Sequence, residues 1–380
     1  MPPYYPLLED AQLIAAEQQR IAQNLLTLKR SLKAQIPVKT LDSRLLLASW
    51  NIREFDSTKY GQRTPEAIAY IAEIIRHFDL IAIQEVRRDL TGLNRLMKAL
   101  GKNWNVIFSD TSEGQQGNQE RFAFVYDNRK ITMGGMAGRM IIPPKKDKDK
   151  VYQPQNQLYR PPYLVSFEAG WTRFIMTTVH IAYGGNKNDA PNRLEEIRLL
   201  TSFLSKRADA AKSWSNNMIL LGDFNIFKPD NDTFKILNSK FFVPPQLQKL
   251  PSNAIKNKHY DQIAFRVPGI DPFLPQPPDE VLDRAFTNPN QLVQAGKLYK
   301  AGVFDFFEYV FKEEEARIYE KAMGKAYYVT SKGVPRTERG QKTYYKTGWR
   351  TFQMSDHLPM WIELPIDDSE DYLIAKTTMV

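Results

Sequence analysis

The chain has 380 residues, of which 42% are hydrophobic and 25% charged, so it can bury a core, and the composition argues against wholesale disorder. It contains no cysteine, which excludes disulfides, thiolate catalysis and zinc–thiolate sites. The net charge of +9 favours a polyanionic partner such as nucleic acid, a phosphoinositide or an anionic membrane, without choosing among them.

No membrane-spanning or secretory segment is apparent. No apolar run approaches the roughly 18 residues that a membrane helix needs. The first residues, MPPYYPLLEDAQ, lack the basic and apolar regions of a signal peptide. We therefore expect a cytoplasmic protein, or an extracellular one if a signal peptide has been removed.

The first predicted element is a helix over residues 9–34, followed by Pro37. Its apolar side chains form a single stripe: Ile14, Ile21, Leu25, Leu28 and Leu32. We expect this N-terminal helical extension, residues 1–40, to dock on the rest of the chain. A homo-oligomer formed through the stripe is the less favoured alternative.

A strand–helix–strand unit follows. The run at residues 45–50 predicts a buried strand, Thr64-Pro65 opens a helix, and residues 80–83 predict a second strand. A further helix is predicted at residues 191–204. Further strands are predicted at residues 105–108, 122–126, 163–167, 173–179, 218–221, 262–265 and 360–364. The pattern indicates an α/β (α+β) fold: a four-layer sandwich of two packed mixed β-sheets flanked by helices.

We expect one catalytic domain over residues 41–366, with insertions at about 134–162 and 311–350, and a C-terminal tail over 367–380. The first insertion has paired glycines, paired prolines and alternating lysine and aspartate, which predict a solvated loop. Residues 267–280 are rich in proline and predict extended chain.

Residues 321–350 are basic and rich in aromatic side chains. The cations are Lys321, Lys325, Lys332, Arg336, Arg339, Lys342, Lys346 and Arg350, against one acid, Glu338. The aromatics are Tyr327, Tyr328, Tyr344, Tyr345 and Trp349. Such a segment can track a phosphate backbone and stack on bases. It can equally be a solvated insertion whose aromatics pack on the domain, and both readings stay open.

Polar residues recur where apolar strands end: Asn51, Gln84-Glu85, His180, Gly222-Asp223-Phe224-Asn225 and Ser355-Asp356-His357. Each motif alone is common at turns and strand ends. Because strand ends converge at one edge of a sheet, together they predict a shared site. Carboxylate and amide oxygens suit Mg²⁺, and histidine moves protons near neutrality. This combination suits hydrolysis of a phosphodiester by activated water.

These motifs, in this order, resemble those of the endonuclease/exonuclease/phosphatase superfamily. Four further segments are most similar to the pancreatic-type deoxyribonucleases: Glu120-Arg121, Arg160-Pro161, Tyr260-Asp261-Gln262-Ile263 and Phe304-Asp305-Phe306. The resemblance implies an enzyme, a Mg²⁺-dependent phosphodiester hydrolase that cleaves DNA with low sequence specificity. Mn²⁺ and Ca²⁺ are alternative cofactors.

The resemblance also implies roles for particular residues. The implied catalytic residues are Glu120, His180, Asp223, Asn225, Asp261 and His357, with Glu120 pairing with His180 and Asp261 with His357. The implied metal site consists of Asn51, Glu85 and Asp356. The implied substrate-binding residues are Arg53, Arg87, Arg160 and Tyr260.

One departure bears on specificity: Asn118 stands where the deoxyribonucleases have a tyrosine that stacks on a sugar. We therefore expect a flatter cleavage pattern than is typical of that family. The alternative functions are a phosphatase or sphingomyelinase-like lipid phosphodiesterase of the same superfamily, an abasic-site or exonucleolytic repair enzyme, and a non-catalytic nucleic-acid-binding module.

Overall fold

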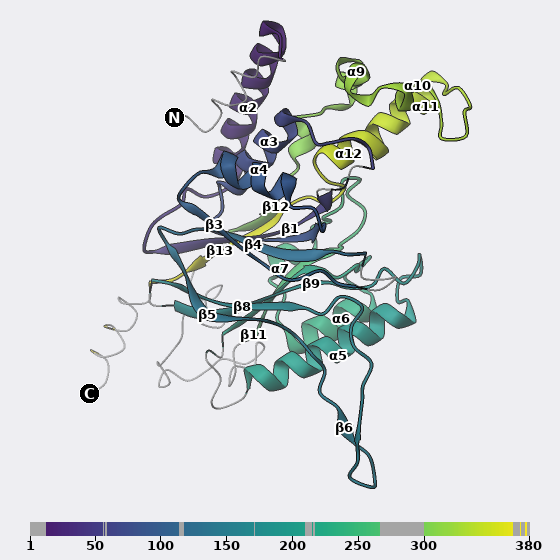
Figure 1. The fold of residues 1–380 in the computed structure, drawn as a ribbon. Coiled ribbons are helices and arrows are strands. Elements are labelled where there is room, and N and C mark those ends of the chain that lie inside the picture. The colour runs from purple at the N-terminus through teal and green to yellow at the C-terminus, as the bar shows by residue number, and fades with distance from the viewer. Residues whose placement is uncertain are drawn as a thin grey trace.

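The computed structural model describes residues 13–55, 57, 59–113, 118–170, 172–209, 215, 217–266, 300–367, 373 and 377. Within them two mixed β-sheets pack face to face, and helices cover both outer faces (Figure 1). The predicted four-layer sandwich is confirmed. The proline-rich residues 267–280 and most of the predicted tail lie outside the described residues.

The first sheet has the strand order β12-β13-β1-β2-β4-β3. Its strands are β1 (Arg44–Phe55), β2 (Leu80–Val86), β3 (Trp104–Phe108), β4 (Arg121–Asp127), β12 (Ala301–Val303) and β13 (Met360–Pro365). Strands β1 and β2 are parallel and are joined by α3 (Pro65–Ile75), as the sequence predicts. The hydroxyl of Thr64 accepts a hydrogen bond from the Ala67 amide, and proline occupies the first helical position, so the helix starts where predicted.

The second sheet has the order β11-β10-β9-β8-β5. Its strands are β5 (Ile131–Arg139), β8 (Tyr163–Ala169), β9 (Thr172–His180), β10 (Met218–Asp223) and β11 (Asp261–Arg266). Parallel strands β9 and β10 are joined by α5 (Pro191–Ala208). The prediction of loop from residue 134 onward is wrong for residues 134–139, which belong to β5. The β5–β8 register shifts between Met133 and Ala137, and this irregularity accommodates the two glycines.

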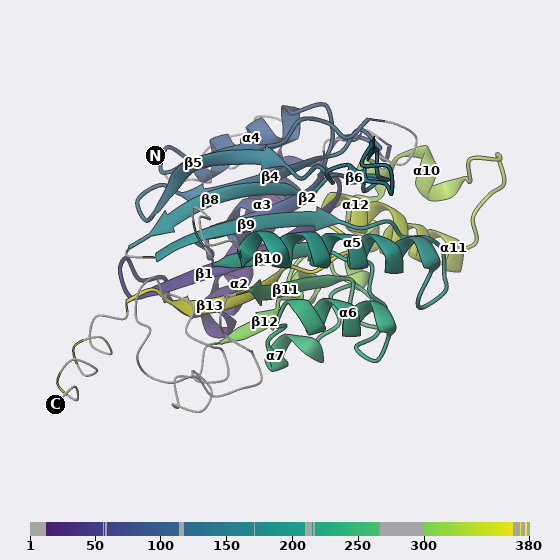
Figure 2. The same cartoon turned by 90° about the horizontal axis from the view of Figure 1, so that it is seen from below.

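Helices close the sandwich on both sides (Figure 2). The first sheet is covered by α2 (Ala15–Gln35), α3 and α4 (Thr91–Leu100); the second by α5, α6 (Asp232–Lys240) and α7 (Pro245–Gln248). Between the sheets, Phe124 of β4 meets Phe167 of β8 edge to face at 5.5 Å. Burying side chains of this size contributes roughly 2–3 kcal/mol each, so this interface is a main source of stability.

Helix α2 docks on the domain, as predicted. Its stripe from Ile21 to Leu32 is buried in the same core cluster as α3. Arg20 forms an ion pair with Glu66 of α3 at 2.7 Å, and Tyr319 of the 311–350 insertion also hydrogen-bonds to that carboxylate. The stripe is therefore used inside the chain, which leaves little of it for an oligomer.

The segment from residue 306 onward is helical, which the sequence analysis did not foresee. It comprises η1 (Phe306–Glu308), η2 (Glu313–Tyr319), α9 (Glu320–Met323), α10 (Lys325–Tyr328), α11 (Glu338–Thr343), the π-helix η3 (Tyr344–Trp349) and α12 (Arg350–Gln353). Tyr327, Tyr345 and Trp349 are buried, and the Tyr319 ring packs against the rings of Tyr345 and Trp349. Their burial favours the packing role for these three rings, whereas Tyr328 and Tyr344 remain accessible. The hairpin of β6 (Lys145–Lys146) and β7 (Tyr152–Gln153) projects from the second sheet (Figure 1).

Candidate active site

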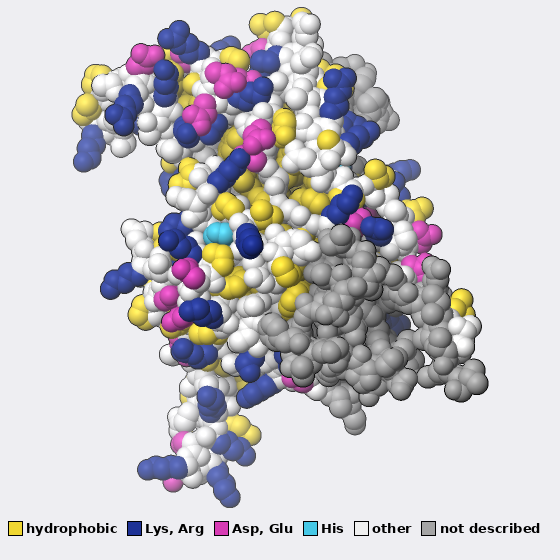
Figure 3. Space-filling view, turned by 180° about the vertical axis from the view of Figure 1, so that it is seen from behind, with side chains coloured by type: hydrophobic (Ala, Val, Ile, Leu, Met, Phe, Trp, Pro, Cys, Tyr) yellow, Lys and Arg dark blue, Asp and Glu magenta, His cyan; other side chains and the backbone are white. Residues whose placement is uncertain are grey.

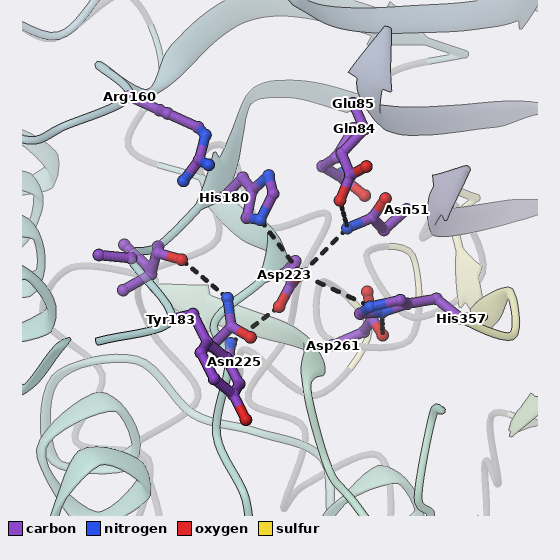
Figure 4. Close-up of polar contacts among 12 residues, drawn as sticks. Asn51, Gln84, Glu85, Arg160, His180, Tyr183, Asp223, Asn225, Asp261 and His357 are labelled. Carbon is purple, nitrogen blue, oxygen red and sulfur yellow. Dashed lines mark hydrogen bonds and ion pairs between the residues drawn. The ribbon is translucent and has the colours of Figure 1, made fainter. Parts of the chain in front are cut away.

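The predicted site residues meet at one edge of the sandwich, where both sheets contribute strand ends (Figure 4). In the second sheet Asp223 is the register partner of His180 on β9 and of Asp261 on β11. These three residues therefore lie side by side across adjacent strands. In the first sheet Asn51 of β1 is the register partner of Gln84, next to Glu85 on β2.

Two histidine–carboxylate pairs each bridge the sheets. Nδ1 of His180, from the second sheet, lies 2.9 Å from Oε2 of Glu120, which precedes β4 of the first. Nδ1 of His357, which precedes β13 of the first sheet, lies 2.8 Å from Oδ2 of Asp261 on β11 of the second. When Nδ1 donates to a carboxylate, the ring orientation is fixed and Nε2 is left for chemistry.

Both Nε2 atoms point at one oxygen. Oδ2 of Asp223 lies 3.5 Å from Nε2 of His180 and 3.7 Å from Nε2 of His357, and it accepts a 3.0 Å hydrogen bond from the Asn51 amide. Figure 4 shows the Asp223 carboxylate between the two rings. The arrangement brings two proton-transfer groups and one carboxylate to a single point.

The Gly-Asp-Phe-Asn turn has a steric basis. Gly222 adopts φ +133°, and a Cβ there would lie 2.2 Å from the carbonyl oxygen of Val179. Only glycine lets β10 approach β9 this closely. The Asn225 backbone amide donates to Oδ1 of Asp223, and its side-chain amide donates to the carbonyl of Ile181. Asn225 thus braces the Asp223 carboxylate and ties the two strand ends together.

Glu85 and Asn51 lie beside irregularities in the strands. The β1–β2 register shifts between Asn51 and Phe55, and the β2–β4 register shifts between Ile83 and Val86. Glu85 itself has a φ of +62°. Bulges and unusual dihedral angles of this kind re-aim side chains and cluster at functional sites. Here they direct the Glu85 carboxylate to the Asn51 amide, at 2.9 Å, and to the Glu54 backbone amide, at 2.7 Å.

These residues fit a hard divalent cation. The buried Oδ1 of Asn51 has no hydrogen-bond partner among the described residues, and an orphaned carbonyl oxygen is a ready ligand. Glu85 lies beside it, and the half-exposed Asp356 acts electrostatically on Glu85. Within the described part of the chain no three His, Asp or Glu side chains form a complete cage. Mg²⁺ does not need one, because it is commonly held by one or two carboxylates together with water and substrate phosphate.

Charge is concentrated at the centre. Burial raises the pKa of Glu85, and the neighbouring Glu120 and Asp356 carboxylates raise it further. Burial also opposes ionisation of Glu120, but His180 and Arg160 outweigh it and lower the Glu120 pKa to about 2. The pKa of His357 is raised well above its usual value, since Asp261 and Asp223 outweigh burial.

A pocket of about 280 Å³ opens over these groups. The described residues that line it are Arg53, Glu54, Glu85, Arg87, Asn118, Glu120, Arg160, His180, Asp356 and His357. All are polar or charged. Three are arginines, which suits an anionic substrate, while the carboxylates between them suit a bridging cation.

The predicted substrate-binding residues take different positions. Nε of Arg160 lies 2.7 Å from Oε2 of Glu120. Arg87 hydrogen-bonds to the carbonyl of Asn118 and lies 3.9 Å from Glu120. Tyr260 does not line the pocket; its ring stacks on His357 at 5.3 Å and supports that imidazole from behind.

Two residues that support the site were not in the predicted set. The Gln84 amide donates to Ser49 of the first sheet and to Thr178 of the second, at 3.2 and 2.8 Å. The Ser355 hydroxyl donates to the Asn51 carbonyl and accepts from the His357 backbone amide. Both lie beside predicted site residues in the sequence, which is the signal that could have identified them.

Comparison with known proteins assigns the class. Residues 48–357 match the Endonuclease/Exonuclease/phosphatase family, and the chain belongs to it. Among curated relatives, the Deoxyribonuclease of Thioalkalivibrio sp. (strain K90mix) is 31% identical over 188 residues, 48% of this chain and 46% of that protein. Deoxyribonuclease-1 of Bos taurus is 25% identical over 191 residues, 48% of this chain and 60% of that protein. The chain thus spans about half the length of these relatives.

Solved structures with the same family name also match. The endonuclease/exonuclease/phosphatase from Bacteroides vulgatus is 12% identical, with a TM-score of 0.47; the match covers 87% of this chain and 100% of that one.

Among the residues that the structure describes, no helix has the length and apolar character that a membrane-spanning segment needs.

Proposed function

We propose that this chain is a divalent-metal-dependent phosphodiesterase whose substrate is DNA, which it cleaves as an endonuclease with low sequence specificity. The observation that carries the proposal is the convergence of two imidazoles, each held by its own carboxylate, on the Asp223 carboxylate. The curated relatives named deoxyribonuclease support DNA as the substrate.

Asn51, Glu85 and Asp356 would hold the cation, with Mg²⁺ the best match to their oxygen donors. When bound there, it supplies charge stabilisation at the scissile phosphate. The chain's own residues do the rest. Arg160 and Arg87 neutralise and orient the phosphate from one wall of the pocket, and Arg53 does so from the rim.

The two imidazoles handle protons. Hydrolysis needs one proton removed from the attacking water and one delivered to the leaving oxygen, and two independently held imidazoles can serve both needs. His180 and His357 reach the same point from opposite sheets. One imidazole can therefore accept a proton from the attacking water while the other donates a proton to the leaving oxygen. Asp223, between them, orients whichever groups occupy that point.

The pocket wall favours a nucleic acid over a lipid. Its described lining contains no apolar side chain that could receive an acyl chain. A sugar–phosphate backbone needs only charge and hydrogen bonds there. The two alternative functions, a phosphatase and a lipid phosphodiesterase, are distinguished from a nuclease by the activity panel that follows.

The test is an activity panel. Purified protein is incubated with supercoiled plasmid, short duplex, inositol phosphates and sphingomyelin, with Mg²⁺ or with EDTA. We expect nicking of plasmid that EDTA abolishes. Preferential turnover of inositol phosphates or sphingomyelin would overturn the substrate assignment, and unchanged nicking in EDTA would overturn the metal dependence.

The mechanism is tested by truncation. His180→Ala and Asp223→Ala should each reduce kcat by orders of magnitude, on the order of 10²-fold or more, because each removes a group from the reacting point. His77→Ala is the matched control, since His77 bonds to the Glu73 carbonyl on α3, away from the site. Circular dichroism checks folding. Near-normal turnover in either variant would contradict the mechanism.

A further inference from the structure

A row of arginine and tyrosine side chains leads from the pocket rim onto the 311–350 insertion. The guanidinium carbon of Arg53 lies 5.5 Å from the ring centre of Tyr60. The Tyr60 and Tyr344 ring centres are 6.3 Å apart, and the guanidinium carbon of Arg336 lies 4.7 Å from the ring centre of Tyr344. We call Arg53, Tyr60, Tyr344 and Arg336 the arginine track.

The track is fixed to the active site at one end. Arg53 lines the pocket, with its Nε 3.8 Å from Oδ2 of Asp356. Its Nη1 donates to the carbonyl of Thr347 at 3.1 Å and to the hydroxyl of Thr351 at 2.5 Å. Thr347 belongs to the insertion, and Thr351 lies on α12 (Arg350–Gln353), directly after it. The insertion and the pocket rim are therefore joined through one side chain.

The rings are packed closely enough to hold the cations in place. A Cβ at Gly348 would lie 3.4 Å from the Tyr344 ring and 3.6 Å from the Tyr60 ring, so the π-helix is in van der Waals reach of both rings. Phe352 supports Tyr60 from another side, with ring centres 5.2 Å apart. A guanidinium stacked on a braced ring loses little freedom when it binds a ligand.

The arginines keep donors for a ligand. Arg336 uses Nε to bond the carbonyl of Ala326, and none of the described residues accepts a hydrogen bond from its Nη1 or Nη2. Nη2 of Arg53 likewise has no acceptor in the described part of the chain. A planar guanidinium with free terminal nitrogens matches a phosphate group.

We propose that the arginine track binds the phosphate backbone of a polynucleotide strand where it leaves the scissile phosphate, so that the natural substrate is a chain of nucleotides. This inference deepens the proposed function and rests on it. The track begins beside the catalytic groups and ends on the insertion, so a ligand must extend beyond one phosphodiester to touch Arg336. Figure 3 shows lysine and arginine side chains, interspersed with acidic ones, on the part of the insertion that projects from the domain.

An anionic membrane is the competing ligand, and the geometry disfavours it. Binding at a membrane surface is strongest where basic side chains are combined with apolar side chains that insert among the lipids. The rings of the track are half-buried, and each has a guanidinium over it. The two rings therefore hold guanidinium groups in place and do not offer an apolar side chain to a lipid surface.

The test measures binding of the full chain in EDTA, which holds back cleavage, by fluorescence anisotropy over a salt series. The probes are a labelled long duplex and a labelled dinucleotide. For the duplex, Arg336→Ala should raise Kd about five- to tenfold and lower the slope of log Kd against log salt by about 0.9, the value for one lost phosphate contact. The dinucleotide should show no such change, because it cannot reach Arg336.

Tyr344 tests the bracing. Tyr344→Ala should raise the duplex Kd and Tyr344→Phe should restore it, because phenylalanine keeps the ring under Arg336. Arg198→Ala, an exposed arginine of α5 paired with Glu195, controls for loss of charge. Tyr328→Ala controls for loss of an exposed ring on the same insertion. Neither control variant should change the duplex Kd by more than the experimental error.

Three outcomes would overturn the inference: an unchanged Kd and salt slope in Arg336→Ala, an equal effect on the dinucleotide, or weakened binding to phosphatidylserine vesicles with duplex binding intact. Arg336→Lys keeps the charge without the planar fork, so it should keep the wild-type salt slope and raise the duplex Kd by less than Arg336→Ala, which gives a second measurement if the alanine variant misfolds. Wild-type cleavage is scored separately. If the wild-type protein nicks plasmid but Arg336→Ala leaves duplex binding unchanged, the proposed function stands and this inference is wrong.

Discussion

Glu120 lies among basic and polar side chains of the site. His180, Arg160 and the Asn118 side chain all contact it, and Arg87 lies nearby. With its pKa lowered to about 2, it stays ionised at any pH at which the enzyme would work. A permanently charged Glu120 holds the His180 ring in one orientation. In the proposed mechanism, substitution of Glu120 itself would therefore act through the position of His180.

Asn118 offers a test of sequence preference. Its amide donates to Oε1 of Glu120 at 3.1 Å, its side chain is exposed at the pocket, and its φ is +54°. We predict that Asn118→Tyr makes cleavage more uneven along a duplex, because an added ring contacts the sugar and senses groove shape. The variant also loses the bond to Glu120 and strains the backbone by about 1 kcal/mol, which should lower overall rate.

Asn118→Ala is the matched control, since it shares the lost bond and the backbone strain but adds no ring. Cleavage maps of one end-labelled duplex compare wild type with both variants. A ladder for Asn118→Tyr that matches the Asn118→Ala ladder would show that position 118 does not read the groove.

Among the elements, α3 carries an acid in an unfavourable place. Glu73 is buried, its Oε2 has no hydrogen-bond partner among the described residues, and burial raises its pKa to about 7 despite the nearby Arg76. The folded state therefore holds a proton that the unfolded state releases between about pH 4.5 and 7. The contribution of Glu73 to stability is largest below pH 4.5 and is lost as pH rises through 7.

We predict that Glu73→Gln removes this pH dependence. A shift of this size corresponds to about 3 kcal/mol, as an upper bound, lost from the wild type between the two pH limits. Urea unfolding of both proteins from pH 5 to pH 8 measures the difference, and the variant should gain stability relative to wild type as pH rises. Parallel curves would mean that Glu73 is solvated or paired in solution. Glu195→Gln, an exposed acid on α5, serves as the control.

At the scale of the whole molecule, the site and the sheet interface are the same structure. Each histidine–carboxylate pair takes one partner from each sheet, and Gln84 links Ser49 to Thr178 across the same gap. A shift of one sheet against the other would break all of these contacts together. The helices outside the sandwich, including α2, fix the sheets and so support the chemistry at a distance.

Helix α2 gives a prediction about assembly. Leu28 is fully buried against the domain, so Leu28→Ala should lower the free energy of unfolding by about 2–5 kcal/mol. Because the stripe packs within its own chain, we expect a monomer in sedimentation velocity and a Tm that does not depend on protein concentration. A Tm that rises with concentration, and falls to a concentration-independent value in Leu28→Ala, would instead support the oligomer. Leu26→Ala, on the exposed face of α2, is the control.

The sequence by itself determined most strands of the two sheets, because their apolar runs end at polar residues, and it determined which side chains meet at the candidate site. Asn51, Glu85, His180, Asp223 and His357 stand out because a carboxylate, an amide or an imidazole at the end of a buried strand has to be solvated or used. The start of α3 at Thr64-Pro65 could also be predicted from the local sequence, because a helix cap depends only on residues of the first helical turn.

Only the tertiary structure decided the remainder. Strand β5 was missed because Gly134 and Gly135 signal a turn locally, whereas pairing with β8 makes them part of a bulged strand. The helices of the 311–350 insertion have no strong sequence pattern, and their aromatics are buried by contact with Tyr319 and the domain. The cross-sheet pairing of the histidines and the stacking of Arg53, Tyr60, Tyr344 and Arg336 join residues far apart in the chain. Such contacts depend on how the sheets and helices pack, which no local pattern encodes.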